Sequence, residues 1–237
     1  MVESDRQITT FAPRMEDIIK DMRGRLRRAM NGVASAGMRA QGIDYKLNFG
    51  VALPEIKEMA LLYTKDAALA ERLWKEDVRE LKIMATLLQP YEAFTREQAE
   101  QWAADIRYVE IAGQYCINLL QYLSFADALA AGWIRREEGF VQVTGFLLYA
   151  RLFSAGYRLS SGQEPIFLDA ARQVMDKGIS RSQRSAVLAL KRYGRQSRQQ
   201  ADRTLHSIAG YASCRSPEKQ EFYNDIKFEF DFYFKHS

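Results

Sequence analysis

The sequence predicts an all-α protein in which antiparallel helix pairs stack as a right-handed α-α superhelix, or solenoid. Apolar residues recur at helical spacing along most of the 237 residues. Caps and prolines separate these stretches into runs of about 10 to 15 residues, joined by turns of about 2 to 6 residues. The single stretch that alternates like a strand has no partner strand. A globular helical bundle is the alternative that periodicity leaves open.

The stretch from Leu73 to Pro90, "LWKEDVRELKIMATLLQP", shows the pattern best. Its apolar stripe consists of Trp74, Val78, Leu81, Ala85 and Leu88. The charged residues off this stripe, which we expect to face water or the neighbouring pair, are Lys75, Arg79, Glu80 and Lys82. Asp66 and Asp77 are typical N-caps, and Pro90 ends the run. The stretch therefore predicts two short helices that meet near Asp77.

Similar signals mark the other helices. Pro54 suits the first turn of a helix over residues 54–63, and Ser216 with Pro217 opens the last one. Capping boxes are predicted at Thr95 with Gln98 and at Ser180 with Gln183, and Ser124 is a candidate N-cap. A further stripe is formed by Tyr108, Ile111, Tyr115, Leu119 and Tyr122. Residues 140–153 are apolar nearly all round, which predicts a helix covered on several sides.

Residues 226–234, "IKFEFDFYF", alternate like a strand, but Phe222, Ile226, Phe230 and Phe234 also recur every four residues. We therefore predict a C-terminal capping helix over residues 216–237. Residues 1–12 are expected to be a flexible tail, so one domain of about five or six HEAT-like pairs of roughly 40 residues occupies the chain. The aromatic residues of the last helix exceed what one buried stripe needs, so a surface for a protein partner or for self-association is an alternative to simple capping.

Composition narrows the setting. No run of about 18 apolar residues occurs, which excludes a membrane span, and the first residues lack a secretory signal. Cys116 and Cys214 cannot form a disulfide framework and suit a reducing, cytoplasmic location.

The basic residues are concentrated in one segment. Residues 177–203 hold eight basic residues and one acidic residue, a net charge of +7, whereas the whole chain has +4. A second basic cluster lies in "MRGRLRRAM", residues 22–30. Clustered guanidinium groups suit phosphate partners, although a basic run is often only a solvated helix face.

Other chemistries are poorly supported. The two histidines, His206 and His236, show no metal-ligand spacing with the two cysteines. Cys116 and His206 could be imagined as a nucleophile pair, but a buried structural cysteine is favoured. The stretch "SAGYRLSSGQEP" lacks the features of a phosphate-binding loop and is predicted to connect two helices. We expect no metal and no cofactor.

Several stretches resemble one family. "NFGVALPEIKEMA", "AERLWKEDVRELKIMATLLQPY", "WAADIRYVEIAGQYCINLL" and "GWIRREEGFVQVTGFLLYARL" are similar to the DNA alkylation repair family of HEAT-like proteins, the alkylpurine DNA glycosylases and their relatives. The similarity extends over roughly residues 47–195 and consists of apolar and tryptophan positions. The resemblance implies a concave basic surface that holds duplex DNA and a cleft in which tryptophans, one aspartate and one arginine excise cationic bases.

At the positions that match this motif, the chain carries other residue types. The resemblance places the first tryptophan at Val109, the aspartate at Gly113, the arginine at Val143 and the second tryptophan at about Leu188. Glu110 is the one carboxylate within a turn of Gly113. The tryptophans that are present, Trp74, Trp102 and Trp133, are expected to pack the scaffold.

The leading prediction is a family member whose concave basic face binds the phosphates of double-stranded DNA, with excision of alkylated purines left open. The predicted phosphate contacts are Arg181, Arg184, Lys191, Arg192, Arg195 and Arg198. Lys191, Arg195 and Arg198 would share one face if the helix continues past Gly194, whereas a helix end at Gly194 would leave the last two in a turn. The alternatives are a non-catalytic protein that recognises deformed or branched DNA, and a protein-interaction scaffold.

Overall fold

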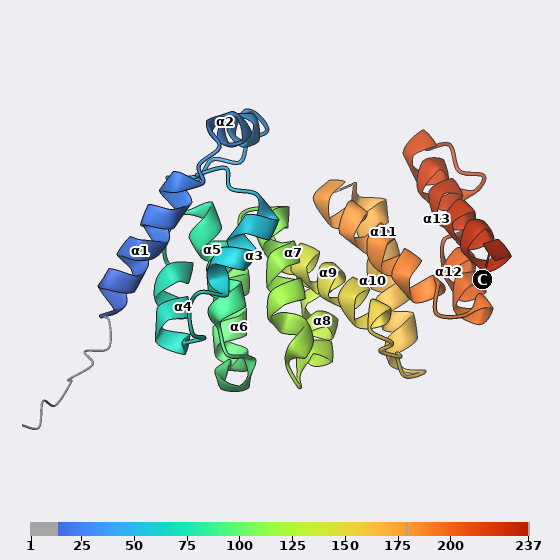
Figure 1. Cartoon of the computed structure of the whole chain (residues 1–237). Coiled ribbons are helices and arrows are strands. Elements are labelled where there is room, and N and C mark those ends of the chain that lie inside the picture. Colours follow the sequence, from blue (N-terminus) through green and yellow to red (C-terminus); the bar gives the residue numbers. More distant parts are fainter. Residues whose placement is uncertain (1–13, 179, 237) are drawn as a thin grey trace, which may run out of the picture. The chain divides into compact units, whose positions relative to one another are not determined.

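Helices form nearly all of the regular structure in the computed structural model, which describes residues 14–178 and 180–236 (Figure 1). In these residues the one β feature is an isolated bridge between Leu47 and Val78. The chain folds as two compact units, one ending at Leu88 and the other starting at Gln89. The predicted tail at residues 1–12 lies outside the described residues, and so does the side chain of Ser180, on which its predicted capping box with Gln183 depends.

The first unit contains five helices in its described residues, 14–88. They are α1 (Met15–Arg28), α2 (Gly32–Ala40), α3 (Leu53–Ala60), α4 (Ala67–Trp74) and α5 (Arg79–Leu88). Helix α5 packs against α4 and α3, and α3 also contacts α1. The predicted pair of short helices around Asp77 is therefore confirmed.

Two local signals in this unit acted as expected. The Asp66 carboxylate accepts a hydrogen bond from Leu69 N at 2.7 Å and caps α4. Pro54 lies in the first turn of α3. Asp77, the other predicted N-cap, lies one residue before the N-cap position of α5, which begins at Arg79. Its Oδ2 accepts a hydrogen bond from Lys46 N at 3.1 Å, which ties the turn between α4 and α5 to the segment before α3. The predicted apolar stripe from Trp74 to Leu88 is buried along its whole length.

The expectation that the charges of this stretch face water is wrong for α5. Arg79, Glu80 and Lys82 are only 2%, 0% and 8% exposed. Glu80 accepts hydrogen bonds from Arg79, at 3.0 Å, and from the backbone N–H groups of Phe49 and Val51, at 3.2 and 3.3 Å. Periodicity within α5 could not reveal this, because the segment that covers these charges comes from about thirty residues earlier in the chain.

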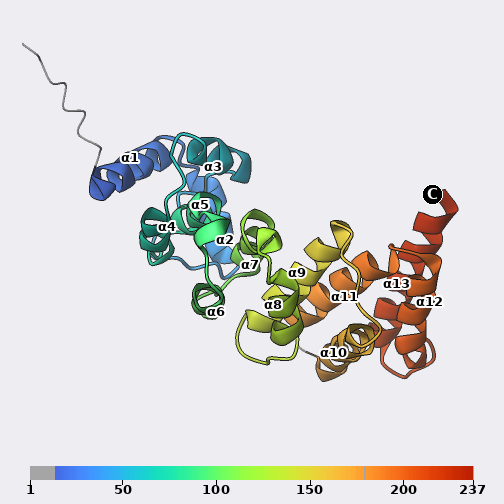
Figure 2. The same cartoon turned by 90° about the horizontal axis from the view of Figure 1, so that it is seen from below.

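Within the part that the structure describes, the second unit contains eight α-helices, visible from another side in Figure 2. They are α6 (Arg96–Ala104), α7 (Val109–Asn118), α8 (Ala126–Trp133), α9 (Val141–Ser154), α10 (Gln163–Lys177), α11 (Ser180–Gly194), α12 (Arg198–Ser207) and α13 (Pro217–His236). Short 3-10 turns lie at Tyr91–Ala93, Leu120–Tyr122 and Ala209–Tyr211. The odd-numbered helices α7, α9, α11 and α13 form one layer in which each packs on the next, and α8, α10 and α12 pack behind them.

Helix α9 is the centre of this unit. As predicted, it is buried on nearly every side. Gly145 permits the close approach of α8, because a Cβ at this position would lie 2.8 Å from Trp133 Cβ and from Ile134 N. Next to it, four aromatic rings with centroids 5.1 to 5.5 Å apart connect α9 to α10 and α11; they belong to Tyr149, Phe153, Phe167 and Tyr193.

In this unit one predicted cap is confirmed, while another cap and one position of a predicted stripe are wrong. The capping box of Thr95 and Gln98 is present, with both reciprocal hydrogen bonds. Ser124 is not the cap of α8, because the N-cap position is Phe125 and no side chain caps it. Tyr122 does not continue the α7 stripe, because α7 ends at Asn118. Its side chain is exposed and contacts Tyr91, with ring centroids 5.8 Å apart.

The C-terminal stretch is a helix, as its spacing of four predicts. Ile226 and Phe230 are buried, and the Phe230 ring lies so close to Gly194 that a Cβ there would overlap it. Phe228 and Phe232 are 70% and 57% exposed on the other side of α13. The predicted use of this surface by a protein partner or a second copy stays a prediction.

Candidate nucleic-acid interface

The arginines of α11 form an exposed stripe. Arg181 and Arg184 are exposed and Arg192 is half-buried, while Ala186, Leu190 and Tyr193 on the opposite side are buried. The Arg181 guanidinium lies 4.7 Å from the centroid of the Phe140 ring. None of these three arginines forms an ion pair with a carboxylate in the described part of the chain. We refer to Arg181, Arg184 and Arg192 as the α11 stripe.

The other three predicted contacts interact with α13 instead. Lys191 Nζ lies 2.7 Å from the Asp225 carboxylate and 3.8 Å from that of Glu229. Arg195 pairs with Glu229 and lies 5.1 Å from the Tyr233 ring centroid.

Arg198 also binds α13, donating to Phe234 O at 2.9 Å. Helix α11 ends at Gly194, so Arg195 lies in the turn and Arg198 begins α12. The shared helical face that a continuous helix would have given is therefore not formed. The positive charges of Lys191 and Arg195 are partly compensated, whereas those of the α11 stripe are not.

The positions that the family resemblance assigned to catalysis carry no acid. Val109 is 47% exposed at the start of α7, and Gly113 one turn later has open space where a side chain would project. Leu188 is half-exposed in α11, but Val143 is fully buried in α9. Glu110 is half-buried in the first turn of α7. The arrangement therefore brings no carboxylate to the Gly113 position and no tryptophan to the exposed positions of α7 and α11.

The three tryptophans belong to the core, as predicted. Trp74, Trp102 and Trp133 are each about 1% exposed. Trp133 Nε1 donates a hydrogen bond to Glu100 at 2.8 Å, and the Trp102 ring packs against Phe94 with centroids 4.9 Å apart. They are therefore not available to bracket a base.

Cys116 is also structural. It is 1% exposed, its Sγ lies 3.5 Å from Thr144 O, and burial raises the pKa of its thiol far above the usual value. A thiol held in its neutral form is a poor nucleophile. Across the described residues, no three His, Cys, Asp or Glu side chains converge as metal ligands would.

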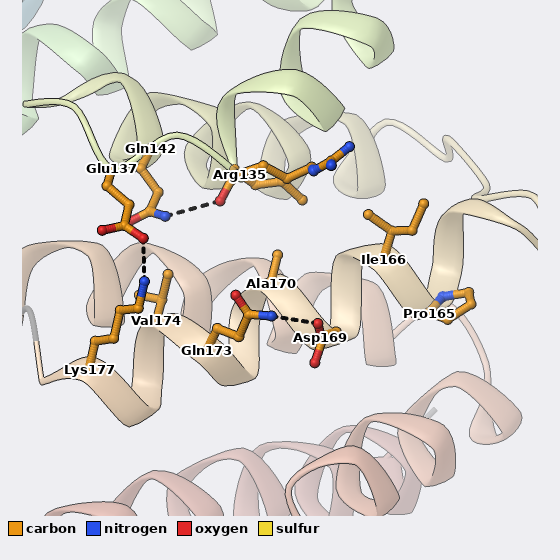
Figure 3. A pocket seen from close by; sticks show the side chains of 11 residues that line it. Arg135, Glu137, Gln142, Pro165, Ile166, Asp169, Ala170, Gln173, Val174 and Lys177 are labelled. Carbon is orange, nitrogen blue, oxygen red and sulfur yellow. Dashed lines mark hydrogen bonds and ion pairs between the residues drawn. The ribbon is translucent and has the colours of Figure 1, made fainter.

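A cavity of about 590 Å³ lies between α10 and the loop that follows α8 (Figure 3). Lys177 pairs with Glu137, and Asp169 pairs with Arg172 and accepts from Gln173 at 2.6 Å. Gln142 Nε2 donates to Ile134 O at 3.0 Å. Arg135 also lines the cavity and forms no ion pair in the described part of the chain. Because two basic and two acidic side chains line the cavity, it presents no net charge toward a ligand.

The model of a family described as DNA alkylation repair enzyme matches residues 22–213. The chain belongs to this family. The match extends beyond residues 47–195 of the predicted resemblance and includes residues of both compact units. No curated protein sequence matches the chain.

One similar solved structure comes from "a new family of proteins related to the HEAT-like repeat DNA glycosylases with affinity for branched DNA structures". It is 14% identical, with a TM-score of 0.71, and the alignment covers 80% of this chain and 81% of that one. A designed armadillo repeat protein is 12% identical over 93% of this chain and 96% of its own, with a TM-score of 0.40. The predicted all-α, HEAT-like fold is confirmed.

The structure also identifies a basic residue that the sequence analysis did not select. Arg158 lies in the loop after α9, which was predicted only to connect two helices, and its guanidinium donates to Gln196 O at 3.4 Å. This brings it beside Arg192 and Arg195, and the three side chains line a second cavity, of about 380 Å³. The loop sequence contains no periodic signal that could have shown this approach.

Among the described residues, no helix combines the length and apolar character that crossing a bilayer requires.

Proposed function

We propose that this chain binds double-stranded DNA through the α11 stripe and recognises a deformed or branched site without cleaving the N-glycosidic bond. The observation that carries the proposal is the stripe itself: three arginines on one face of a helix, with no carboxylate paired to them among the described residues. Guanidinium groups presented in this way neutralise backbone phosphates and position a duplex without reading its sequence.

Membership of the DNA alkylation repair family supports a DNA ligand, and the affinity of the similar protein for branched DNA supports the choice of a branched site. The lack of base cleavage is inferred from Val109, Gly113, Val143 and Leu188, which offer neither the carboxylate that stabilises a developing oxocarbenium ion nor an aromatic face. The two free cysteines accord with a cytoplasmic location.

The test of DNA binding is a salt titration with duplex and four-way-junction DNA of the same sequence. Replacing all three stripe arginines by alanine is expected to reduce the slope of log K against log salt by about 3. The matched control replaces three exposed arginines elsewhere, Arg39, Arg135 and Arg215, and removes the same net charge. Equal losses for both triple variants, or binding that does not respond to salt, would contradict the proposal.

Base excision is the second candidate, and Glu110 is the observation in its favour, because it lies one turn before Gly113 in α7. Duplex DNA containing N7-methylguanine would be incubated with the protein, and release of the base would be compared with binding of the same DNA. We expect binding without release. Release that Glu110→Gln abolishes would instead establish catalysis.

A further inference from the structure

A second basic feature lies where α9 and α11 end. A cavity of about 380 Å³ is lined by Arg158, Arg192 and Arg195, together with Gln196, Tyr233 and the last residues of α9. We call it the arginine cavity. Unlike the α11 stripe, which is an exposed helix face, it is a concave site where guanidinium groups from separate segments converge.

The three arginines differ in how far their charges are compensated. Arg192 has no carboxylate partner in the described part of the chain, and Arg158 donates only to a backbone carbonyl, Gln196 O. Arg195 pairs with Glu229, but its Nε is buried and has no acceptor within the described structure. Three cationic groups therefore face one carboxylate, which leaves about two positive charges at the cavity.

The least favourable elements for an anion are the carboxyl ends of α9 and α11, where helix carbonyls carry partial negative charge. The side chain of Gln196 reduces this effect. Its Nε2 donates to Phe153 O at 3.1 Å and to Tyr157 O at 2.7 Å. Phe153 O also accepts from Gly156 N at 3.0 Å, and at the end of α11 Lys191 O and Tyr193 O each accept a backbone hydrogen bond at 3.1 Å. Because these carbonyls are hydrogen-bonded, the positive charges of the guanidinium groups are opposed less strongly.

An excess of about two positive charges matches a phosphate monoester, which carries about −1.5 to −2 at pH 7, better than a phosphodiester with a single charge. Guanidinium groups donate paired, planar hydrogen bonds that fit phosphate oxygens. A monoester also has three unsubstituted oxygens that can accept from the guanidinium groups, whereas a diester has two. We propose that the arginine cavity binds the terminal phosphate of a DNA strand, an inference that rests on the proposed function.

The position of Arg192 explains why a nucleic-acid end is the favoured source of this phosphate. Arg192 belongs both to the α11 stripe and to the arginine cavity. From Arg181 to Arg192 the helix rises roughly 16 Å, enough to accompany several nucleotides at about 3.4 Å per base pair. A strand that follows the stripe therefore arrives with its end at the cavity.

The test uses DNA duplexes that each carry a single-stranded branch. The branch ends in either a phosphate or a hydroxyl, the DNAs are otherwise identical, and 5′ and 3′ ends are tested separately. We expect the phosphorylated branch of one polarity to bind about tenfold more tightly. Arg158→Gln should abolish this preference and keep most of the affinity for the hydroxyl form. The matched control, Arg184→Gln, should weaken both DNAs by the same factor and leave the preference intact.

Circular dichroism melting of the variants checks that they fold, and Arg158→Lys, which retains the charge, should recover part of the preference. Equal binding of phosphate and hydroxyl ends, with the loss caused by the triple α11 stripe variant still present, would overturn this inference and leave the proposed function standing. The inference would also be overturned if inorganic phosphate or a phosphopeptide competed equally with DNA that carries a phosphate end and DNA that carries a hydroxyl end. No DNA binding at low salt would overturn both proposals.

Discussion

Helices α5 and α11 each carry several charged residues among apolar ones, but the structure places these charges in opposite environments. In α5, Arg79 and Glu80 are buried under residues 47–51 and bind each other and the backbone. In α11, Arg181 and Arg184 are exposed and have no carboxylate partner among the described residues. The charges of α5 are therefore part of the packed fold, while those of Arg181 and Arg184 remain available to a ligand.

The difference arises from what covers each helix. Helix α5 is packed by α3 and α4, and the chain before α3 closes over its remaining face. Helix α11 packs on α9, α10, α12 and α13, but one face stays open. A buried ion pair is costly to break because the remaining partner loses its compensation, whereas an exposed arginine contributes little to stability.

The largest expected effect is on α5. Glu80→Ala should lower the free energy of unfolding by about 3 to 5 kcal/mol, because it leaves Arg79 buried without its carboxylate. Urea denaturation measures this change. The control is Glu71→Ala, which removes a partly exposed pair with Lys75 and should cost less than about 1 kcal/mol. Similar losses of unfolding free energy in the two variants would show that the buried Arg79–Glu80 pair contributes no more to stability than a partly exposed pair.

The next effect concerns the contact between α11 and α13. Gly194→Ala should destabilise the protein by about 1 to 3 kcal/mol, because the added Cβ overlaps the Phe230 ring. Thermal and urea melts measure it. Gly113→Ala is the control, since open space surrounds that position in α7 and alanine is the better helix former, by about 0.5 to 1 kcal/mol. A neutral Gly194→Ala would mean that α13 moves away from α11 at little cost.

Arg184→Ala should change DNA binding and leave stability within about 0.5 kcal/mol, because the side chain is exposed. The slope of log K against log salt should fall by about 1, the contribution of one phosphate contact. Fluorescence anisotropy at several salt concentrations measures the slope, and urea denaturation measures the stability. Arg135→Ala, which removes an exposed arginine at the end of α8, should leave the slope unchanged, and an equal decrease would refute the assignment of the stripe.

The smallest effect is expected at α13. Glu229→Gln removes the carboxylate that compensates Lys191 and Arg195, so DNA affinity at low salt should rise by a factor of a few. Stability should fall by less than about 1 kcal/mol, since the pair is partly exposed. Glu221→Gln, at an exposed position of the same helix, changes the net charge equally and serves as the control. Equal gains in both variants would indicate a general charge effect.

Local interactions determined what could be predicted from the sequence. Helical periodicity, the Asp66 cap and the Thr95–Gln98 capping box depend on residues within about four positions, and they correctly placed α4, α5 and α6. The apolar pattern also supported the family, which the match over residues 22–213 confirmed. Of the six predicted phosphate contacts, Arg181, Arg184 and Arg192 could be expected from the sequence to lie at the surface, because they share one basic face of a helix.

Tertiary structure decided which charges are free to bind. Glu80 reaches the backbone of Phe49 from 31 positions away, and Arg158 reaches that of Gln196 across 38. Likewise, Lys191, Arg195 and Arg198 are engaged by a helix that follows them in the chain. The free energy of a charged group depends on its burial and on the charges beside it, and both are set by segments distant in sequence. For this reason the helices could be read from local pattern, while the arginine cavity required the fold.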